Sequence, residues 1–463
     1  MLENIYLHLG FIGYKFKEIK ELKMNHNINA HSRLYLSALL DGEEKLDPVF
    51  ATQPGTQIGL MNTNKEEPPI FAGMVQTIQV KHLSGVYHVE ISAVSNSYML
   101  DVRRERRSFQ DRALQYRDML KEVTSTYVGS DFAYRVAERP IGTFTMQYEE
   151  TDWEFIKRMA SRFNAGLVPD YRFQTPKFTF GIPQGQNRGR LENYNFYIRK
   201  DVASFMVSSQ NWNESLSELD AIRFVVQTDE EFIIGDSVTY RDTILFVRSV
   251  EGQISEGVLR FTYELSTQNG LTQDRLFNER ITGLSLRGKV LESVQDTVRV
   301  HLEIDGTQNL GTAWNFPYTT LYTAEGHAGW YCMPEVGDMV LIYFPNNREE
   351  NAVSVNSMRE NGGVGNPDVK IFRTPNGKEL KFSPDEILIT CVDGGIFMRL
   401  NEGSGIEIIS SQNININSSS NMSLQASKKI NISADDEILL TCKSSIMRLD
   451  SSVSLDGSDV YLG

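Results

Sequence analysis

The chain has 463 residues and a formal net charge of −14 at pH 7, so general binding to nucleic acid or to anionic membranes is not expected. Hydrophobic residues make up 40% and aromatic residues 10% of the sequence, which indicates folded domains rather than disorder. A chain of this length typically holds about three domains.

The amino-terminus and the cysteines favour a protein of a reducing compartment. The first 20 residues contain no uninterrupted apolar segment and no small-residue cleavage site, and no long apolar run follows. We therefore expect no signal peptide and no membrane-spanning segment. Cys332, Cys391 and Cys442 are far apart and lack CxxC spacing, which favours buried thiols over disulfides or a zinc site.

Residues 1–100 are predicted to form a first β-rich domain. Alternating or β-branched runs bounded by Gly, Pro and Asn predict strands near residues 31–40, 56–62, 70–80 and 86–95.

The spacing of apolar residues changes in the next segment, residues 101–170. Apolar residues from Phe109 to Tyr127 recur every three or four positions, which predicts an amphipathic helix with Ser108 as its N-cap.

A second helix is predicted to begin after Thr151, because Thr151 and Glu154 form a T-x-x-E capping box. Its end is expected near Asn164 and Gly166. The apolar stripe of this helix comprises Phe155, Ile156, Met159 and Phe163.

The rest of the chain returns to strand patterns. Residues 171–280 predict a second barrel or sandwich, and residues 281–360 have the size and strand count of a five-stranded OB-type barrel. The Gly-rich residues 361–368 predict a linker. From residue 369, short strands lead into a repeat.

The repeat runs from Ile406 to the end of the sequence with a period of eight residues. Positions one and three are apolar in nearly every unit and lie on one face of a short strand, while a small or polar fifth residue allows a turn. Such a period predicts stacked β coils. The predicted core residues are Ile406, Ile408, Ile414, Ile416, Met422, Leu424, Ile430, Ile432, Ile438 and Leu440.

Two inward side chains per unit give a single chain little core. A buried aliphatic side chain contributes roughly 1.5–3 kcal/mol, whereas ordering the backbone costs about 1–2 kcal/mol per residue. Three identical chains wound together would share one core and leave few free edges. We therefore favour a homotrimeric β-prism over a single-chain solenoid.

Several strings, in this order, resemble the VgrG family, the spike proteins of type VI secretion systems, and the related hub and spike proteins of contractile phage tails. The resemblance covers essentially the whole chain. The strings are IFAGMVQTI from Ile70, YMLDVRRERRSFQDRALQYRDML from Tyr98, QYEETDWEFIKRMASRF from Gln147, IIGDSVTY from Ile233, GWYCMPEVGDMVLIYFPNN from Gly329 and the terminal repeat.

The resemblance implies a homotrimer that is mainly β with a few helices. The implied domains are a first hub β-barrel (1–100), a helical or mixed insertion of the hub (101–170), a second hub β-barrel (171–280), an OB-like β-barrel (281–360), a linker (361–368) and a triple-stranded β-helix spike (369–463). Two barrels in each of three chains would present six similar faces to a hexameric tail-tube protein.

The resemblance also implies partners and a location. Baseplate proteins would surround the hub, and a PAAR-like cone protein, with or without effectors, would cap the tip. Val460, Tyr461 and Leu462 at the blunt end of the repeat are the candidate tip contacts. Assembly in the bacterial cytoplasm would precede injection through a target envelope, or the protein would belong to a virion tail.

No catalytic residue, cofactor or metal site is predicted. Glu149 and Glu150 are sequence neighbours and would point to opposite faces of a strand. The acidic run 435–437 falls at a corner of the repeat, and His327 lies outside any HExxH or HxH pattern.

The densest positive cluster, Arg103, Arg104, Arg106 and Arg107, lacks the aromatic interleaving of a nucleic-acid site. These arginines precede a predicted helix whose acidic partners include Glu105, Asp111 and Asp118. We expect a solvated face or inter-subunit salt bridges.

Two other functions remain as alternatives from the sequence, a phage tail receptor-binding fibre and a cell-wall-degrading spike. No lysozyme-like insert separates the OB-like domain from the repeat, which argues against the second. The sequence leaves open whether the machine is a type VI system, a phage tail, a bacteriocin or an extracellular contractile particle. It also leaves open the effectors, the target cell, and whether a protein or a metal caps the spike.

Overall fold

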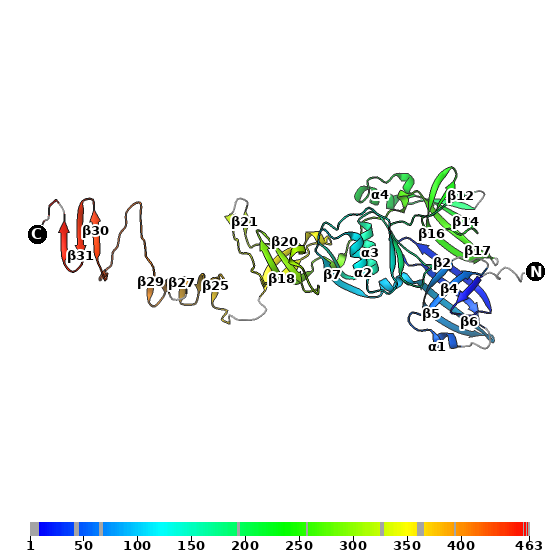
Figure 1. The fold of residues 1–463 in the computed structure, drawn as a ribbon, viewed down its shortest axis with the longest axis horizontal. Helices are drawn as coiled ribbons and strands as arrows, with labels where there is room; N and C mark the ends of the chain where they lie inside the picture. The colour runs from blue at the N-terminus through cyan, green and yellow to red at the C-terminus, as the bar shows by residue number, and fades with distance from the viewer. Residues whose placement is uncertain are drawn as a thin grey trace, which may run out of the picture. The chain divides into compact units, whose positions relative to one another are not determined.

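The computed structural model describes residues 9–40, 46–63, 68–191, 195–255, 258–324, 328–358, 365–392, 395–456, 458–459 and 461. The chain divides into two units, residues 1–361 and 362–463, and each is described by itself. Strands dominate both units and helices are few (Figure 1), so the predicted mainly β fold class is confirmed.

The largest sheet of the first unit has 12 strands, which come from two separate parts of the sequence. The main path runs β1-β4-β5-β6-β3-β2-β16-β17-β14-β13, and β15 joins β12 to β16. The earlier strands are β1 (Leu9–Ile12), β2 (Glu18–Asn27), β3 (Arg33–Leu39), β4 (Gln57–Asn62), β5 (Phe71–Leu83) and β6 (Val86–Ser95). The later strands are β12 (Asn187–Arg190), β13 (Phe196–Lys200), β14 (Ile222–Thr228), β15 (Ser237–Tyr240), β16 (Thr243–Ser255) and β17 (Val258–Ser266).

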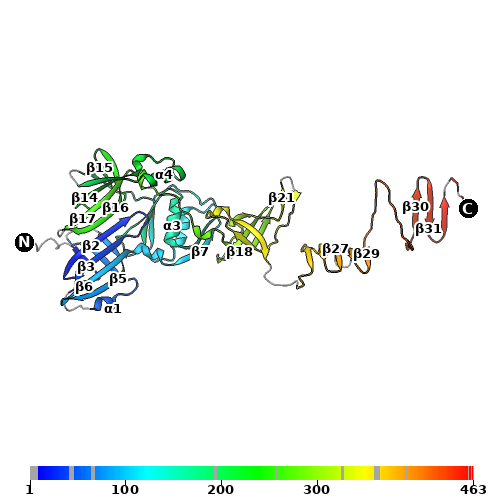
Figure 2. The same cartoon turned by 180° about the vertical axis from the view of Figure 1, so that it is seen from behind.

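The two halves of this sheet are continuous because β2 pairs antiparallel with β16, Lys23–Asn27 lying against Ser249–Gln253. These two strands lie side by side in both views (Figures 1 and 2). One apolar core runs under both halves and includes Leu22, Met24 and Val250. The strands assigned from sequence to two hub barrels therefore share a sheet and a core, and their division into separate barrels stays a prediction.

The second predicted helix is confirmed as α3 (Asp152–Ser161). The Thr151 hydroxyl accepts a hydrogen bond from the Glu154 amide at 3.1 Å, and the Glu154 carboxylate accepts one from the Thr151 amide at 3.0 Å. This is the capping box predicted from the sequence. Phe155, Ile156 and Met159 are buried in a core that also contains residues of α2 (Tyr116–Thr124).

The first predicted helix is placed too early, and Ser108 is not its N-cap. Arg104–Phe109 instead form strand β7, which pairs with β9 (Thr145–Thr151). Ser108 donates through its amide and its hydroxyl to the carboxylate of Asp305, at 2.7 and 2.6 Å. Long-range strand pairing therefore overrides the helical periodicity, and only α2 follows it.

Three smaller sheets complete the first unit. A three-stranded sheet comprises β8 (Asp131–Tyr134), β10 (Leu167–Pro169) and β11 (Lys177–Phe180). A five-stranded antiparallel sheet has the order β20-β19-β18-β23-β24. Its strands are β18 (Ser285–Val294), β19 (Thr297–Leu302), β20 (Asn315–Pro317), β23 (Met339–Tyr343) and β24 (Val353–Met358). A short ribbon pairs β21 (Thr323–Ala324) with β22 (Ala328–Gly329).

The remaining helices are short and lie in connections. The α-helices are α1 (Asp47–Ala51) and α4 (Val202–Asn211). The 3-10 helices are η1 (Asn96–Asp101), η2 (Glu218–Ala221), η3 (Asn269–Leu271), η4 (Glu279–Ile281), η5 (Leu310–Thr312) and η6 (Glu349–Asn351). None of the helices in the described ranges has the length and hydropathy that crossing a bilayer requires.

The second unit consists of antiparallel strands, each paired with its sequence neighbour. Five of them, β25 (Lys370–Arg373), β26 (Glu379–Phe382), β27 (Glu386–Val392), β28 (Ile396–Asn401) and β29 (Gly405–Ser410), form one sheet. A second sheet comprises β30 (Ile438–Cys442), β31 (Ser445–Leu449) and β32 (Val453–Asp456). Residues 411–437 pair with no other strand of the described chain.

The expected burial of the thiols is wrong for the single chain. Cys332, Cys391 and Cys442 are free and exposed. Cys391 lies on β27 and Cys442 on β30.

His26 is a titratable group inside the core at the pairing of β2 with β16. Its side chain is 2% exposed, and its ring stacks on Tyr171 at 3.6 Å between centroids. Burial without a compensating charge lowers the pKa of His26 to about 3. The ring is therefore neutral in the folded protein over the physiological range.

Protonation of His26 should destabilise the fold at acidic pH. The folded-state pKa lies below the ordinary value of 6.5, so its contribution is complete above pH 6.5 and is lost as pH falls toward 3. In that window stability should decrease by about 1.4 kcal/mol per pH unit from this group. His26→Phe should flatten the pH dependence measured by urea unfolding between pH 7 and pH 4.

The matched control is His82→Phe, because His82 is exposed on β5. This variant should keep the wild-type slope. An unchanged slope in His26→Phe would contradict the assignment.

Candidate functional site

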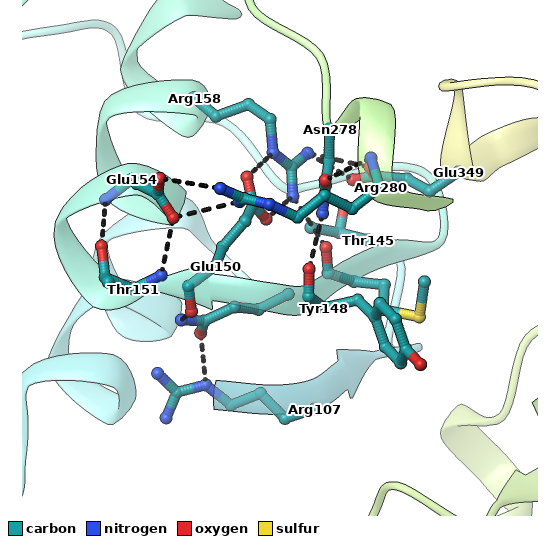
Figure 3. A network of polar contacts seen from close by, with 12 residues as sticks. Arg107, Thr145, Tyr148, Glu150, Thr151, Glu154, Arg158, Asn278, Arg280 and Glu349 are labelled. Atoms are coloured by element: carbon teal, nitrogen blue, oxygen red, sulfur yellow. Dashed lines mark hydrogen bonds and ion pairs between the residues drawn. The ribbon is translucent and has the colours of Figure 1, made fainter. Parts of the chain in front are cut away.

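Four charged residues form a buried cluster between α3 and the segment before β24, and we call it the ionic joint: Glu150, Arg158, Arg162 and Glu349. Arg158 donates to both oxygens of Glu150, through Nε and Nη2 at 2.7 Å each. Its Nη1 donates to both oxygens of Glu349 at 3.0 and 2.8 Å, and Arg162 also donates to Glu349. In Figure 3 Arg158 lies between the two carboxylates.

Local structure explains how these side chains meet. Glu150 lies on β9, just before the capping residue that begins α3. Arg158 lies on the last turns of α3 and Arg162 follows one turn later, so the two residues share a face. Glu349 opens η6, in the connection from β23 to β24. The joint therefore ties β9 and α3 to the five-stranded sheet.

The joint is nearly dry. Arg158, Glu150 and Glu349 are 3%, 4% and 2% exposed. Burial opposes the charged form of Arg158, but the carboxylates of Glu349 and Glu150 outweigh it and raise the pKa of Arg158 above its ordinary value. A third acceptor, the carbonyl oxygen of Met146, bonds Nη2 at 2.7 Å, so every side of the guanidinium is satisfied.

Further polar contacts surround the joint and join the same parts of the chain. Glu154 accepts from Arg280 at 3.1 and 3.2 Å, as Figure 3 shows. Asn278 donates from Nδ2 to the carbonyl oxygen of Tyr148 at 2.8 Å. Together with the Ser108–Asp305 contact, these bonds fix the five-stranded sheet against β7, β9 and α3.

The ionic joint is a structural element that sequence reasoning missed. A signal was present, since Arg158 interrupts the apolar stripe of the capping-box helix beside Met159. A charged residue on a buried helix face requires a partner. The sequence does not reveal that one partner is Glu349, 191 residues away.

The acidic residues weighed as catalytic candidates do not converge. Glu149 has a positive φ of 52° at an irregularity in the β7–β9 pairing and accepts from Arg106, whereas Glu150 points into the joint. Residues 435–437 are exposed, and His327 lies outside the described residues. Within the described ranges, no group of three or more His, Cys, Asp or Glu is placed to hold a metal ion.

Three residues of the arginine run form ion pairs within the chain, and inter-subunit salt bridges stay a prediction. Arg103 pairs with Glu105, Arg106 with Glu149, and Arg107 with Asp152. The expected partner Asp118 instead pairs with Lys121 at 2.8 Å.

The predicted core residues of the repeat are exposed in the single chain. Ile438 is half-buried, and the other nine are between 51% and 75% exposed. These nine are Ile406, Ile408, Ile414, Ile416, Met422, Leu424, Ile430, Ile432 and Leu440. The structure therefore brings none of them into a core within one chain.

The strands observed in the repeat begin close to the predicted unit boundaries. Strands β29, β30, β31 and β32 each carry the apolar first residue of a unit at their first or second position. At the tip, Tyr461 is 92% exposed, while Val460 and Leu462 lie outside the described residues.

Comparison with known proteins gives a family match over part of the chain and a shared fold. Residues 27–167 match the family model described as phage tail baseplate hub (GPD). No curated protein matches the chain. The similar solved structures described next are distant in sequence.

One such structure is the E. coli c3393 protein, described as a component of the type VI secretion system with structural similarity to the T4 bacteriophage tail proteins gp27 and gp5. It has a TM-score of 0.54 at 13% identity, over 76% of this chain and 99% of its own. Chains of the Francisella PdpA–VgrG complex, half-lidded and lidded, give TM-scores of 0.52 and 0.53 at 9% identity. Those matches cover 87% of this chain and 87% and 79% of the other chains. The chain thus shares a fold with these proteins.

Removing the cation of the ionic joint should strongly destabilise the first unit. Arg158→Met leaves Glu150 and Glu349 buried without a counter-charge, and we expect a loss of about 3–5 kcal/mol in urea unfolding. Arg106→Met is the matched control, because its ion pair with Glu149 is largely exposed. The control should lose no more than about 1 kcal/mol. Equal small losses in both variants would show that the joint does not stabilise the unit.

Proposed function

We propose that this chain, which has a VgrG-like baseplate hub and spike fold, is the structural hub and spike of a contractile injection system. In this proposal three copies assemble, their first units forming the hub and their repeats forming the spike. The hub binds a hexameric tail-tube protein and baseplate proteins. The spike pierces the target envelope.

The observation that carries this proposal is the exposed apolar face of the repeat. A folded protein rarely leaves a long series of aliphatic side chains in water, since each one buried contributes roughly 1.5–3 kcal/mol. Two further copies of the same repeat would supply a matching face with the same period. A core shared by three chains buries residues that one chain leaves exposed, such as Ile414 and Ile430.

The proposed mechanical role follows from the backbone of the repeat. No proline occurs after Pro384, so no later strand lacks an amide donor for pairing. A prism with paired edges and a continuous core resists bending and local unfolding. These are the properties that a rod driven through an envelope requires.

The symmetry of the proposed hub rests on the two halves of the 12-stranded sheet. Each half contributes six strands, and three chains would supply six halves. Six similar surfaces match a hexameric tube without a mismatch in symmetry. Assembly would take place in the bacterial cytoplasm, before injection or incorporation into a phage tail.

At the tip we propose a PAAR-like cone protein, with possible effectors attached. Tyr461, exposed to 92%, is the described residue of the candidate contact set, and Val460 and Leu462 flank it in sequence. An exposed aromatic side chain beside aliphatic residues suits contact with a protein cap.

A charge in the proposed shared core should prevent the spike from assembling. Ile430→Asp places one carboxylate from each chain in the same apolar layer, which should abolish the trimer in light scattering and remove the spike transition from a thermal melt. Asn431→Asp is the matched control. The same charge one residue along faces the opposite side of the strand and should leave both properties unchanged.

An unchanged mass and melting profile for Ile430→Asp would contradict the octad register. A monomeric wild-type chain in light scattering would contradict the shared core itself. Deletion of residues 362–463 then shows whether the hub holds the three chains together unaided.

Removal of residues 456–463 should abolish capture of the tip protein. A variant ending at Leu455 should no longer retain a PAAR-like cone protein in a pull-down, because the candidate contacts are gone. Its mass in light scattering should stay that of the wild type, since the core residues from Ile406 to Leu440 remain. Ser458→Ala is the control and should capture normally. Recovery of the tip protein by the truncated chain would show that the contact lies elsewhere.

A further inference from the structure

The strands before and after the insertion repeat one pairing plan. The order β1-β4-β5-β6-β3-β2 corresponds strand for strand to β12-β15-β16-β17-β14-β13. In each half the longest strand, β5 or β16, has 13 residues and forms a hairpin with the next strand. The plan differs in one detail, since β1 is antiparallel to β4 whereas β12 is parallel to β15.

The two hairpins align residue by residue because each contains one bulge at the same distance from its turn. The extra residue is Gln76 in β5 and Arg248 in β16. The bulge follows Val75, eight residues before Leu83, and Val247, eight residues before Ser255. This alignment makes Val80 equivalent to Gly252.

The same alignment extends across the sheet to β2 and β13. In the first half, Val75 pairs with Ala93, Ala93 pairs with Leu34, and Leu34 pairs with Met24. In the second half, Val247 pairs with Leu265, Leu265 pairs with Phe224, and Phe224 pairs with Ile198. Met24 and Ile198 are therefore equivalent, as are Lys23 and Tyr197.

The repeated plan allows two equivalent contacts between the halves, and the chain forms only one of them in its described part. Strand β2 pairs with β16, placing Met24 opposite Gly252 and Lys23 opposite Gln253. The equivalent contact would join β13 to β5. In the described part of the chain β13 pairs only with β14, and residues 77–83 of β5 pair only with β6.

The exposed side chains of β13 indicate that this strand lacks a neighbour that β2 has. Leu22 and Met24, which face the core beside β16, are 0% and 3% exposed. Their equivalents Phe196 and Ile198 are 39% and 49% exposed. An edge strand with exposed apolar side chains is a ready template for another strand.

We propose that β13 of one chain pairs antiparallel with β5 of a second copy, in the register of the β2–β16 contact. Ile198 then lies opposite Val80, Tyr197 opposite Lys81, and Arg199 opposite Gln79. This inference rests on the proposed trimer and specifies how its hub is joined.

The two sides of this contact differ, and in the proposed trimer three such contacts close a ring. Each copy offers β13 to one neighbour and β5 to the other, which is a heterologous contact. Alternation of β2–β16 contacts within chains and β13–β5 contacts between chains makes three chains a ring of six similar halves. No two like charges lie directly opposite in this register, and the Lys81 ammonium meets the Tyr197 ring.

Helix α1 is the competing occupant of the β5 edge. It belongs to the long β3–β4 connection and lies close to β5, with no backbone hydrogen bond between them in the described residues. The second half has no helix at the corresponding place, between β14 and β15. A test must therefore distinguish a neighbouring β13 from α1 at this edge.

Disulfide trapping in the full chain tests the register. The background carries Cys332→Ser, Cys391→Ser and Cys442→Ser, and the test pair is Lys81→Cys with Tyr197→Cys. Directly opposed residues in antiparallel strands have Cα atoms within bonding reach of a disulfide. The matched positive control is the equivalent pair Lys23→Cys with Gln253→Cys, which should link within one chain. Val80→Cys with Tyr197→Cys places the thiols on opposite faces and is the negative control.

Oxidation of the test pair should give covalently linked dimers and trimers on a non-reducing gel, most of the protein being linked. The positive control should give a linked monomer, and the negative control should stay free. If light scattering shows a trimer and the positive control links but the test pair does not, the register is overturned and the proposed function stands. If the full chain is a monomer, the proposed trimer fails and this contact fails with it.

Discussion

Strand edges and apolar strand faces must be covered, and the architecture of this chain depends on that constraint. Within the first unit the edge of β2 is covered by β16, and the result is a continuous sheet over one core. The second unit covers its edges only by pairing neighbours in sequence, and its apolar faces stay in solvent. The two units therefore differ in how complete they are as single chains, and the proposed assembly would cover the apolar faces of the second unit.

Features set by nearby residues could be predicted from the sequence. The capping box of Thr151 and Glu154 spans four residues, and α3 begins where it predicts. The octad also predicts where several strands of the second unit begin, because strand alternation and corner residues are local. The helix expected from Ser108 failed for the opposite reason. Its segment pairs with β9 and bonds Asp305, 197 residues away, and no local pattern encodes that contact.

The ionic joint shows a second limit of sequence reasoning. The isolated charge of Arg158 on a buried helix face indicates that a partner exists, but a carboxylate such as Glu349 cannot be chosen among 60 acidic residues without the fold. Buried ion pairs contribute little net stability compared with apolar residues, yet leaving one partner alone is strongly unfavourable. The joint therefore restricts how the five-stranded sheet can dock on α3 and β9. A shifted arrangement would bury Glu150 or Glu349 without Arg158.

The repeated halves of the sheet also explain how a chain can distinguish its own strand from that of a neighbour. Within the chain Met24 lies over Gly252, and a Cβ atom at Gly252 would come within 2.9 Å of the Met24 methyl group. The equivalent pair between chains, Ile198 and Val80, has two side chains of medium size. Exchanging the partners would set Met24 against Val80, which overpacks the core, and Ile198 against Gly252, which leaves a void. Each wrong pairing is therefore less stable than the right one, so a duplicated fold can carry two different joints and still assemble in one order.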